Sequence, residues 1–311
     1  MHIVISEFMD EAAVAALRAD FDVRYEPDLV DRRDALLAAL PEADALIVRN
    51  RTRVDAALLA AGPRLKAVGR LGVGLDNIDV PACQAGGIAV LPATGANARA
   101  VAEYVIAAAL MLLRGAYHSS VRVAAGAWPR TELSNGLEAE ARTLGIVGFG
   151  GIGRLAAGLA QGLGMRVAAH DPLLRDDDPA WRDAGVQPLP LDALLARADV
   201  LTLHIPLTDA TRNLLDAGRL AAMKRGAVLI NTARGGIVDE AALAGALRSG
   251  HLRGAAIDVF HDEPLAAGSP LADAPNLVLT PHIAGLTQEA NTRVSSMVAQ
   301  RVAQALQSTG V

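Results

Sequence analysis

Short apolar runs alternate with amphipathic stretches along almost the whole chain, and this alternation limits what the chain can fold into. Parallel strands joined by helices, buried on both faces, give this pattern. Five strands are expected in a first series: His2–Ser6, Val23–Tyr25, Ala45–Val48, Ala67–Gly69 and Ala89–Leu91. Six are expected in a second series: Thr143–Phe149, Arg166–His170, Val200–His204, Ala227–Asn231, Ala255–Val259 and Leu277–Thr280. The sequence therefore predicts an α/β protein with two doubly wound parallel sheets.

The length of 311 residues suits two domains, because one core of ordinary size would not accommodate it. Residues 98–115 form an alanine- and leucine-rich helix expected to link the two series. The last expected helix, Thr287–Gln307, has no strand after it and should pack back on the first domain. We expect a domain of residues 1–97 plus 287–311 and a domain of residues 98–286, with a cleft between them.

Composition excludes several classes of function. A net charge of −5 argues against nucleic acid as the main partner, since no excess of cations neutralises phosphates. The single cysteine, Cys83, excludes an intramolecular disulfide and fits a reducing compartment, so a cytoplasmic location is expected. The longest apolar run, Tyr104–Leu113, is too short for a membrane span, which needs about 20 residues. The Asp176–Asp178 run is expected to be a solvated loop, and no metal site is predicted.

The sharpest motif is the G-x-G-x-x-G at residues 148–153, which contains Gly148, Gly150, Gly151, Ile152 and Gly153. An expected strand enters it and an expected helix leaves it. In this context the first glycine allows a tight turn, the second lets the backbone approach a pyrophosphate, and the third lets helix and strand pack closely. The free N–H groups at the start of the helix then bind phosphates. The motif predicts a dinucleotide site.

Asp171 ends the second strand of this unit, 18 residues beyond Gly153. An acid at this position accepts hydrogen bonds from the adenosine ribose and repels a 2′-phosphate. NAD is therefore favoured as the cofactor over NADP. Arg175 follows closely and could bind a 2′-phosphate, so NADP stays open as an alternative.

Three further segments put polar residues where strands end, which is where open α/β sheets bind ligands. They are residues 231–236, 258–264 and 280–285. Together with Gly72-Val73-Gly74-Leu75-Asp76-Asn77 and the glycine motif, they closely resemble the D-isomer-specific 2-hydroxyacid dehydrogenase family over nearly the whole chain. The resemblance implies a flavodoxin-like substrate domain, a Rossmann NAD domain, and hydride transfer between NAD and a small 2-hydroxy acid.

The resemblance assigns the chemistry to Arg234, Glu263 and His282. Arg234 would bind the substrate carboxylate, because a guanidinium meets a carboxylate through two parallel N–H bonds. His282 would be the proton donor in reduction and the base in oxidation, since imidazole titrates near neutral pH. Glu263 would bond the other ring nitrogen and stabilise the imidazolium.

The remaining residues that the family pattern implies are contacts to cofactor and substrate. The implied cofactor contacts are His204, Pro206, Thr232, Ala233, Arg234, Asp258, His282 and Gly285, and the implied contacts to the substrate carboxylate are the backbone of Val73 and Gly74. His204 and His261 do not match the acid–base position and are interpreted as non-catalytic. The family also implies a homodimer built around the helix near residues 100–113.

A cluster of arginines in the first domain bears on the substrate. Arg49, Arg51 and Arg53 surround Thr52, which stands at capping-box spacing from Asp55, so the cluster should lie at a helix start. Arg99, next to Asn97, adds positive charge, and Arg51, Asn97 and Arg99 are expected to bind substrate. We therefore expect a second anionic group at carbon 3 of the substrate, with (S)-3-sulfolactate favoured. The alternative is a solvated arginine cluster.

Other functions remain open on the sequence. Within the enzyme class they are 3-phosphoglycerate dehydrogenase and hydroxypyruvate or glyoxylate reductase. Formate dehydrogenases of this fold carry glutamine at the position of Glu263. The glutamate in this chain therefore favours hydroxy-acid chemistry. In a different class stand NAD-sensing corepressors that share the fold and keep the Arg–Glu–His set. Turnover of a 2-oxo acid with NADH, lost in His282→Ala, separates an enzyme from a sensor.

Overall fold

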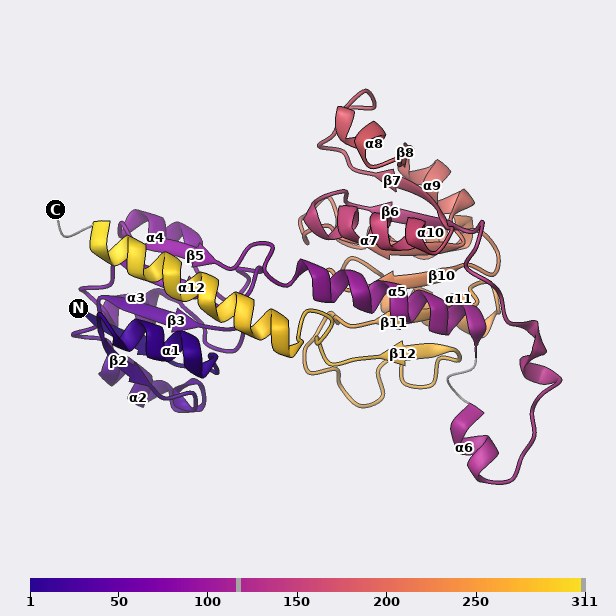
Figure 1. The fold of residues 1–311 in the computed structure, drawn as a ribbon. Helices are drawn as coiled ribbons and strands as arrows, with labels where there is room; N and C mark the ends of the chain where they lie inside the picture. The colour runs from indigo at the N-terminus through magenta and orange to yellow at the C-terminus, as the bar shows by residue number, and fades with distance from the viewer. Residues whose placement is uncertain (116–118, 309–311) are drawn as a thin grey trace. The chain divides into compact units, whose positions relative to one another are not determined.

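The computed structural model describes residues 1–115 and 119–308, which form two units (Figure 1). The first unit contains residues 1–97 and 286–308, and the second contains residues 98–285. Leu286, expected in the second domain, thus groups with the first unit. Residues 309–311, expected to end the first domain, lie outside the described residues.

The first unit is built on a five-stranded sheet in which all strand pairs are parallel. Its strands are β1 (His2–Ile5), β2 (Asp22–Tyr25), β3 (Ala45–Val48), β4 (Ala67–Arg70) and β5 (Ala89–Pro92). Their order is β2-β1-β3-β4-β5, the order of flavodoxin-like sheets. The expected class of this unit is confirmed.

The second unit holds a seven-stranded parallel sheet. Its strands are β6 (Thr143–Val147), β7 (Arg166–His170), β8 (Gln187–Pro188), β9 (Val200–Leu203), β10 (Val228–Asn231), β11 (Gly254–Ile257) and β12 (Leu277–Leu279). The order β12-β11-β10-β9-β6-β7-β8 is that of the Rossmann fold with one strand added at the β12 edge. β9, β10 and β11 are buried along their whole length, which explains their unbroken apolar runs.

Helices cover both faces of the first sheet. α1 (Glu11–Arg18) and α12 (Gln288–Ser308) pack on one face, and α2 (Arg33–Ala39), α3 (Ala56–Ala61) and α4 (Val80–Ala85) pack on the other, where a 3₁₀ turn, η1 (Leu29–Asp31), precedes α2. A Cβ atom on Gly69 of β4 would lie 2.7 Å from Val298, so α12 needs glycine there for its close approach. The sequence did not predict α4, because this short helix buries only Cys83 and so has almost no apolar periodicity.

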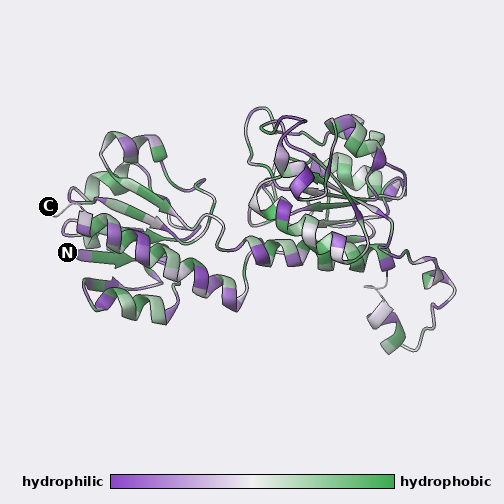
Figure 2. Ribbon diagram, turned by 45° about the horizontal axis from the view of Figure 1, so that its top comes forward, coloured by the Kyte–Doolittle hydropathy of each residue, from purple (hydrophilic) through white to green (hydrophobic). Residues whose placement is uncertain are grey.

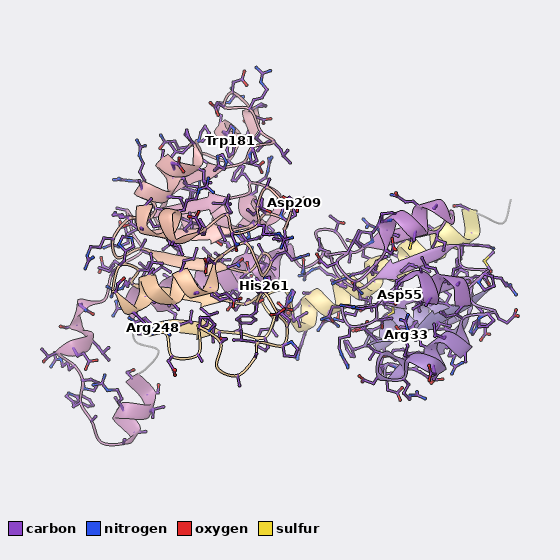
Figure 3. All side chains as sticks on the ribbon, turned by 180° about the vertical axis from the view of Figure 1, so that it is seen from behind. Arg33, Asp55, Trp181, Asp209, Arg248 and His261 are labelled. Atoms are coloured by element: carbon purple, nitrogen blue, oxygen red, sulfur yellow. The ribbon has the colours of Figure 1, made fainter. Side chains whose placement is uncertain are left out.

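The second sheet is covered in the same way. α5 (Ala98–Arg114) and α7 (Gly151–Gly162) pack on one face, and α9 (Leu191–Arg197), α10 (Ala217–Ala222) and α11 (Glu240–Arg248) pack on the other. α8 (Pro179–Asp183) carries Trp181 (Figure 3). The Trp181 ring stacks on that of Phe149, with ring centroids 4.7 Å apart. α6 (Ser119–Ala124) and η2 (Glu132–Asn135) have no buried residue, and α6 lies away from the sheet (Figure 1).

Hydropathy follows these layers. Figure 2 shows hydrophobic residues on the strands of both sheets and a mixture on the covering helices. No helix in the described ranges is long and apolar enough to cross a membrane. Within the same ranges, no group of three or more His, Cys, Asp or Glu side chains could hold a metal ion.

Aspartate begins half of the twelve α-helices in the described residues. Six N-cap aspartates accept a backbone N–H of their own helix: Asp10, Asp55, Asp79, Asp178, Asp216 and Asp239. Each such cap contributes about 1 kcal/mol and satisfies a donor that the helix leaves unpaired. α7 differs, because Gly150 is its N-cap and no side chain caps it.

Candidate active site

The glycine motif forms the turn between β6 and α7, and each glycine has a separate physical reason. Gly148 has φ 95°, and a Cβ there would lie 2.4 Å from the His204 carbonyl oxygen. A Cβ on Gly153 would lie 2.4 Å from the carbonyl oxygen of Gly148. Gly150 and Gly151 instead face open space, with no atom within 4 Å of a Cβ. Gly148 and Gly153 therefore allow the turn to close, whereas Gly150 and Gly151 leave the start of α7 accessible.

Asp171 lies directly beside this turn. Its carboxylate accepts the N–H of Phe149 at 2.8 Å and that of Leu173 at 2.9 Å. Arg175, the candidate partner for a 2′-phosphate, instead bonds Asp177 at 3.0 Å, and both of these side chains are exposed. Asp171 is therefore held next to the glycine turn, whereas Arg175 is paired with Asp177 in its own loop.

The loop after β10 carries Arg234 and is fixed from within. Asn231 is buried, and its side-chain amide accepts the N–H of Ala233 and donates to the carbonyl of Arg234, both at 3.0 Å. The Oγ1 atom of Thr232 is buried and bonds no atom of the described residues. An orphaned buried hydroxyl is costly in a protein and marks a place where a ligand can supply the missing partner.

The loops after β10 and β11 lie in direct contact. A Cβ on Gly235 would lie 1.7 Å from the carbonyl oxygen of Phe260, so no other residue fits there. Gly235 follows Arg234, and Phe260 precedes Glu263 by three residues. The structure therefore brings together the two loops on which the expected guanidinium and carboxylate stand.

Glu263 and His282 are hydrogen-bonded, with 2.9 Å between Oε2 and Nδ1. The other oxygen of Glu263 accepts the N–H of Phe260 at 3.1 Å, which fixes the carboxylate. Because a carboxylate can only accept, Nδ1 carries the proton of this bond and Nε2 is left as the reactive nitrogen. Nε2 has no bonding partner in the described part of the chain, and the ring is 44% exposed, so a substrate can reach it.

Asp258 fixes the loop that carries His282. The Asp258 side chain is 1% exposed, and it accepts the hydroxyl of Thr280 at 2.6 Å and the N–H groups of Ile283 and Ala284 at 2.8 Å. Its carbonyl oxygen accepts the N–H of His282 at 2.8 Å. His282 itself has φ 56°, a left-handed conformation that costs about 1–2 kcal/mol outside glycine.

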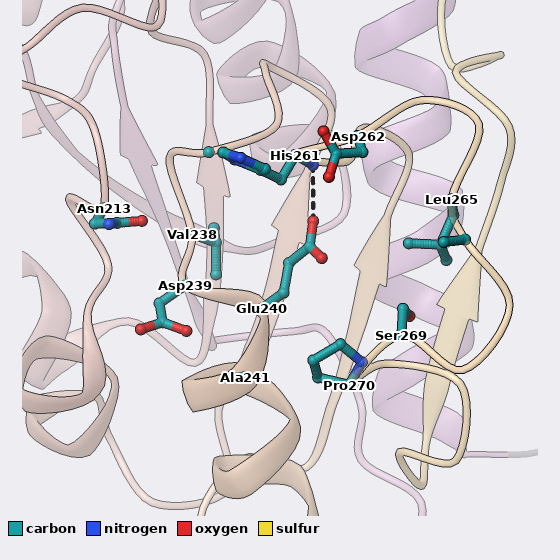
Figure 4. Close-up of a pocket in the computed structure, with 12 residues that line it drawn as sticks. Asn213, Val238, Asp239, Glu240, Ala241, His261, Asp262, Leu265, Ser269 and Pro270 are labelled. Carbon is teal, nitrogen blue, oxygen red and sulfur yellow. Dashed lines mark hydrogen bonds between the residues drawn. The ribbon is translucent and has the colours of Figure 1, made fainter.

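The other two histidines considered above have structural partners. His204 Nε2 lies 3.1 Å from the Thr202 hydroxyl, and burial lowers the pKa of His204 to about 4, so the ring is neutral at pH 7. The backbone N–H of His261 donates to Glu240 at 2.8 Å. The His261 side chain lines a separate cavity of about 440 Å³, to which none of Arg234, Glu263 and His282 contributes (Figure 4).

The arginine loop of the first unit differs from what the sequence predicts. The helix expected to follow the arginine cluster begins at Ala56, and its N-cap is Asp55, which also bonds Arg33 (Figure 3). The expected capping role of Thr52 is therefore wrong. Its hydroxyl is buried against that of Ser6 at 3.0 Å, because the chain turns inward before the helix starts.

Glu7 occupies the backbone donors of this loop. It is buried, and its carboxylate accepts the N–H groups of Arg49 at 2.8 Å, Arg51 at 3.2 Å and Thr52 at 2.9 Å. These backbone donors are thus satisfied by Glu7 and are not left for an external anion. Asn77 also donates to the carbonyl of Thr52 at 2.7 Å, which brings the Gly72–Asn77 segment beside the loop.

The guanidinium groups of the loop have different partners. Arg51 forms an exposed ion pair with Asp31. Arg49 bonds the neutral amide of Asn291 at 2.8 Å and stacks over Phe8, and burial lowers the pKa of Arg49. Arg99 is paired with Glu103 one turn along α5. Of these arginines, only Arg49 has a neutral hydrogen-bond partner and partial burial together.

Comparison with known proteins decides the family. The family model described as "D-isomer specific 2-hydroxyacid dehydrogenase, NAD binding domain" matches residues 106–284. The chain belongs to the D-isomer-specific 2-hydroxyacid dehydrogenases. It is 56% identical to an (S)-sulfolactate dehydrogenase of Chromohalobacter salexigens over 98% of both chains. It is 43% identical to a D-3-phosphoglycerate dehydrogenase of Mycobacterium tuberculosis over 98% of this chain, which spans only 56% of that protein. The crystal structure of the TT0316 protein from Thermus thermophilus has a TM-score of 0.90 and 35% identity, covering 99% of this chain and 97% of the other.

Membership of this dehydrogenase family makes the chain an NAD-dependent oxidoreductase that acts on a CH–OH group. The second unit fits NAD on its own geometry. The start of α7 at Gly150 has no side-chain cap and leaves open space for a pyrophosphate. The buried hydroxyl of Thr232, which has no partner among the described residues, offers a polar contact. The bound cofactor supplies the hydride acceptor.

The other residues expected at the site lie at strand ends of one unit or the other. Pro206 is exposed after β9, Ala233 is buried after β10, and Gly285 ends the second unit. In the first unit Val73 is 38% exposed after β4. Asn97 is the last residue of the first segment of that unit, and its Oδ1 atom is buried without a partner among the described residues.

The sequence assigned no role to three residues that shape the candidate site. Glu7, Tyr104 and Thr280 act through hydrogen bonds to residues distant in the chain. No local pattern marks Glu7, and Tyr104 lies in an apolar helix where an aromatic residue suggests only packing. Thr280 was recognised as part of a motif, but without a role.

We predict that Asp171→Ser weakens NADH binding by roughly 10- to 100-fold, because the lost carboxylate contributed about 1.5–3 kcal/mol of charge-assisted hydrogen bonding. NADPH binding should weaken less, since the repulsion of its 2′-phosphate is removed. The measurement is quenching of Trp181 fluorescence in a Trp128→Phe background, which leaves only the tryptophan that stacks on Phe149.

Asp176→Ser is the matched control, because it removes an exposed acid from the same loop and leaves the Arg175–Asp177 pair in place. The role of Asp171 is contradicted if NADH and NADPH lose the same affinity, or if neither does. Melting temperatures of both variants show whether the turn at Phe149 stays folded.

Proposed function

We propose that the chain oxidises (S)-3-sulfolactate to 3-sulfopyruvate with NAD. The observation that carries the chemistry is the bond between Glu263 and His282 at 2.9 Å, which uses Nδ1 and leaves Nε2 for the substrate on a ring that is 44% exposed. In this role His282 accepts the proton of the substrate hydroxyl at Nε2 as the hydride leaves carbon 2. Glu263 stabilises the imidazolium that forms, and in the reverse reaction His282 returns the proton.

Arg234 binds the substrate carboxylate in this proposal. A bidentate guanidinium–carboxylate contact fixes both the position and the orientation of the acid. Support comes from the loop, in which Asn231 holds the backbone of Ala233 and Arg234 and the Arg234 Nη1 atom donates to the carbonyl of Ala233 at 2.6 Å. A charged group that is already held loses less entropy on binding.

The sulfonate is assigned to the arginine loop of the first unit. Arg49 is the stronger candidate, because its present hydrogen-bond acceptor is neutral and an anion would be a better one. Arg51 can contribute by exchanging Asp31 for the substrate, since an exposed ion pair is worth only about 0–1 kcal/mol. The similarity to a sulfolactate dehydrogenase over 98% of both chains favours a sulfonate over a phosphate.

A 3-phosphoglycerate dehydrogenase is the second candidate, favoured by the 43% identity to the mycobacterial enzyme. The same arginines would then bind the phosphate. The substrate of a hydroxypyruvate or glyoxylate reductase has no second anionic group for these arginines to bind. An NAD-sensing corepressor would bind NAD without turnover.

We predict that the purified protein forms NADH with (S)-3-sulfolactate at a kcat/KM at least tenfold above that with D-lactate. His282→Ala should lower kcat by about 10²–10⁴-fold, the usual contribution of a general acid–base. Glu263→Gln should have a smaller effect, because a glutamine carbonyl still accepts the Nδ1 proton but carries no charge. His261→Ala is the control and should turn over like the unchanged protein.

Equal activity with D-lactate and with either dianion would overturn the second-anion assignment. A higher kcat/KM with 3-phosphoglycerate would move the assignment to the second candidate. NAD binding without turnover of any of these acids would favour a sensor.

A separate test distinguishes the contributions of Arg49 and Arg51 to substrate binding. Arg49→Gln should raise KM for sulfolactate by roughly 10- to 100-fold through loss of about 1.5–3 kcal/mol, and KM for D-lactate by much less. Arg51→Gln should have the same selectivity with a smaller magnitude. Arg53→Gln is the control, since Arg53 is an exposed arginine of the same loop. Equal KM changes for both substrates in Arg49→Gln would show that the arginine supports the fold of the loop and not the anion.

We also propose that the enzyme is a cytoplasmic homodimer. The exposed side of α5 carries two apolar residues, Ala107 and Leu110, between the charged Glu103 and Arg114. Nearby in the chain, Trp128 is 79% exposed, which a second copy of the chain would bury. The cytoplasm is supported by the single, buried Cys83, whose pKa is raised by burial, so that it stays a thiol.

Light scattering after size exclusion should give twice the mass of one chain. Leu110→Glu should shift the protein toward the monomer, because a carboxylate is costly to bury. Leu163→Glu is the matched control, because Leu163, the C-cap residue of α7, is exposed to nearly the same extent. A monomer in the unchanged protein at micromolar concentration refutes the dimer.

A further inference from the structure

His282 has a backbone conformation that is unfavourable for a residue with a Cβ atom. Its φ of 56° belongs to the left-handed region, where a residue with a Cβ pays about 1–2 kcal/mol. Such a conformation persists only where the surroundings over-determine it. Its N–H donates to two carbonyl oxygens, that of Asp258 at 2.8 Å and that of Thr280 at 3.0 Å.

The surroundings that hold it centre on the buried Asp258 carboxylate. Two of the donors to this carboxylate, the N–H groups of Ile283 and Ala284, follow His282 in the chain. The third is the hydroxyl of Thr280, two residues before His282, at 2.6 Å. The carboxylate therefore bonds the loop on both sides of the histidine.

The network continues to α5. The Thr280 hydroxyl lies 2.7 Å from the hydroxyl of Tyr104. Since Thr280 gives its only hydroxyl proton to Asp258, it accepts the proton of Tyr104. Burial raises the pKa of Tyr104, so the phenol keeps that proton at neutral pH. The chain of hydrogen bonds thus runs from Tyr104 to Thr280, to Asp258 and to the loop of His282.

We propose that Tyr104 and Thr280 are positioning residues for the reaction, which hold His282 in its left-handed conformation through Asp258. The inference rests on the acid–base role proposed for His282. α5 packs on the second sheet with a fully buried side, so it is a rigid support for the tyrosine. Without the two hydroxyls Asp258 keeps only its backbone donors, and the loop can relax from the left-handed conformation.

The expected defect lies in the chemical step and not in binding. Neither hydroxyl is assigned to a substrate, so KM should change little. A displacement of about 1 Å at a reacting group can lower the rate about 100-fold. A residue that only stabilises the fold would lower the melting temperature and the amount of active protein without changing the kcat of the active fraction.

The experiment uses the full-length enzyme with NAD and its best 2-hydroxy acid. Thr280→Val removes the hydroxyl at constant shape and should lower kcat by roughly 10- to 100-fold, with KM and NAD affinity within about twofold. Thr280→Ser restores the hydroxyl and should recover most of the loss. Tyr104→Phe should lower kcat by roughly 3- to 10-fold in the same pattern. Tyr25→Phe is the control, because it removes a bonded hydroxyl from the first unit.

Several results overturn the inference. A kcat within about twofold of the unchanged enzyme in both Tyr104→Phe and Thr280→Val would do so, as would failure of Thr280→Ser to restore the activity. A loss confined to KM or to NAD affinity would show that the hydroxyls serve binding. If Thr280→Val does not fold, the Tyr104→Phe and Thr280→Ser results decide. Absence of turnover in the unchanged protein would instead count against the proposed function itself.

Discussion

The hydrogen bonds to the buried carboxylate of Asp258 are the constraint on which the rest of the candidate site depends. Burying a charged group costs several kcal/mol unless hydrogen-bond donors surround it. If the loop around Asp258 moved away, the carboxylate would lose its donors and the folded state would be destabilised by a cost of this size. The donors come from residues on both sides of His282, and the histidine is therefore placed by its neighbours. Two other acids use the same principle: Glu7 collects the N–H groups of the arginine loop, and Asp171 holds the glycine turn.

The parallel topology explains how residues so distant in sequence come together. Every strand of the second sheet ends at the same edge, so the polar residues in the loops after β6, β7, β9, β10, β11 and β12 lie along that edge. Neighbouring loops touch where the residue is small enough, as Gly235 does against the carbonyl of Phe260. The order of the strands, and not the distance along the chain, decides which side chains become neighbours. β10, β11 and β12 are adjacent, and their loops carry Arg234, Glu263 and His282.

Much of the fold could be predicted because the buried strands are continuous apolar runs. The bounds expected for Ala45–Val48 and Arg166–His170 are those observed. Strands were predicted too long where the backbone turns toward the site, at Phe149 and His204, because both residues remain apolar or buried after they leave the ladder. In the site, motifs with fixed spacing were predictable. The hydrogen bonds of Glu7 to Arg49 and of Tyr104 to Thr280 span 42 and 176 residues, and no local periodicity reports such partners.

The buried carboxylate of Glu7 has a consequence for how such an enzyme can diverge. Because it satisfies the main-chain donors of residues 49–52, the shape of that loop does not depend on any ligand. Its arginine side chains can then be exchanged one by one without refolding the backbone beneath them. A lineage could thus acquire a new preferred acid through a few surface replacements, while the machinery in the other unit stays as it is.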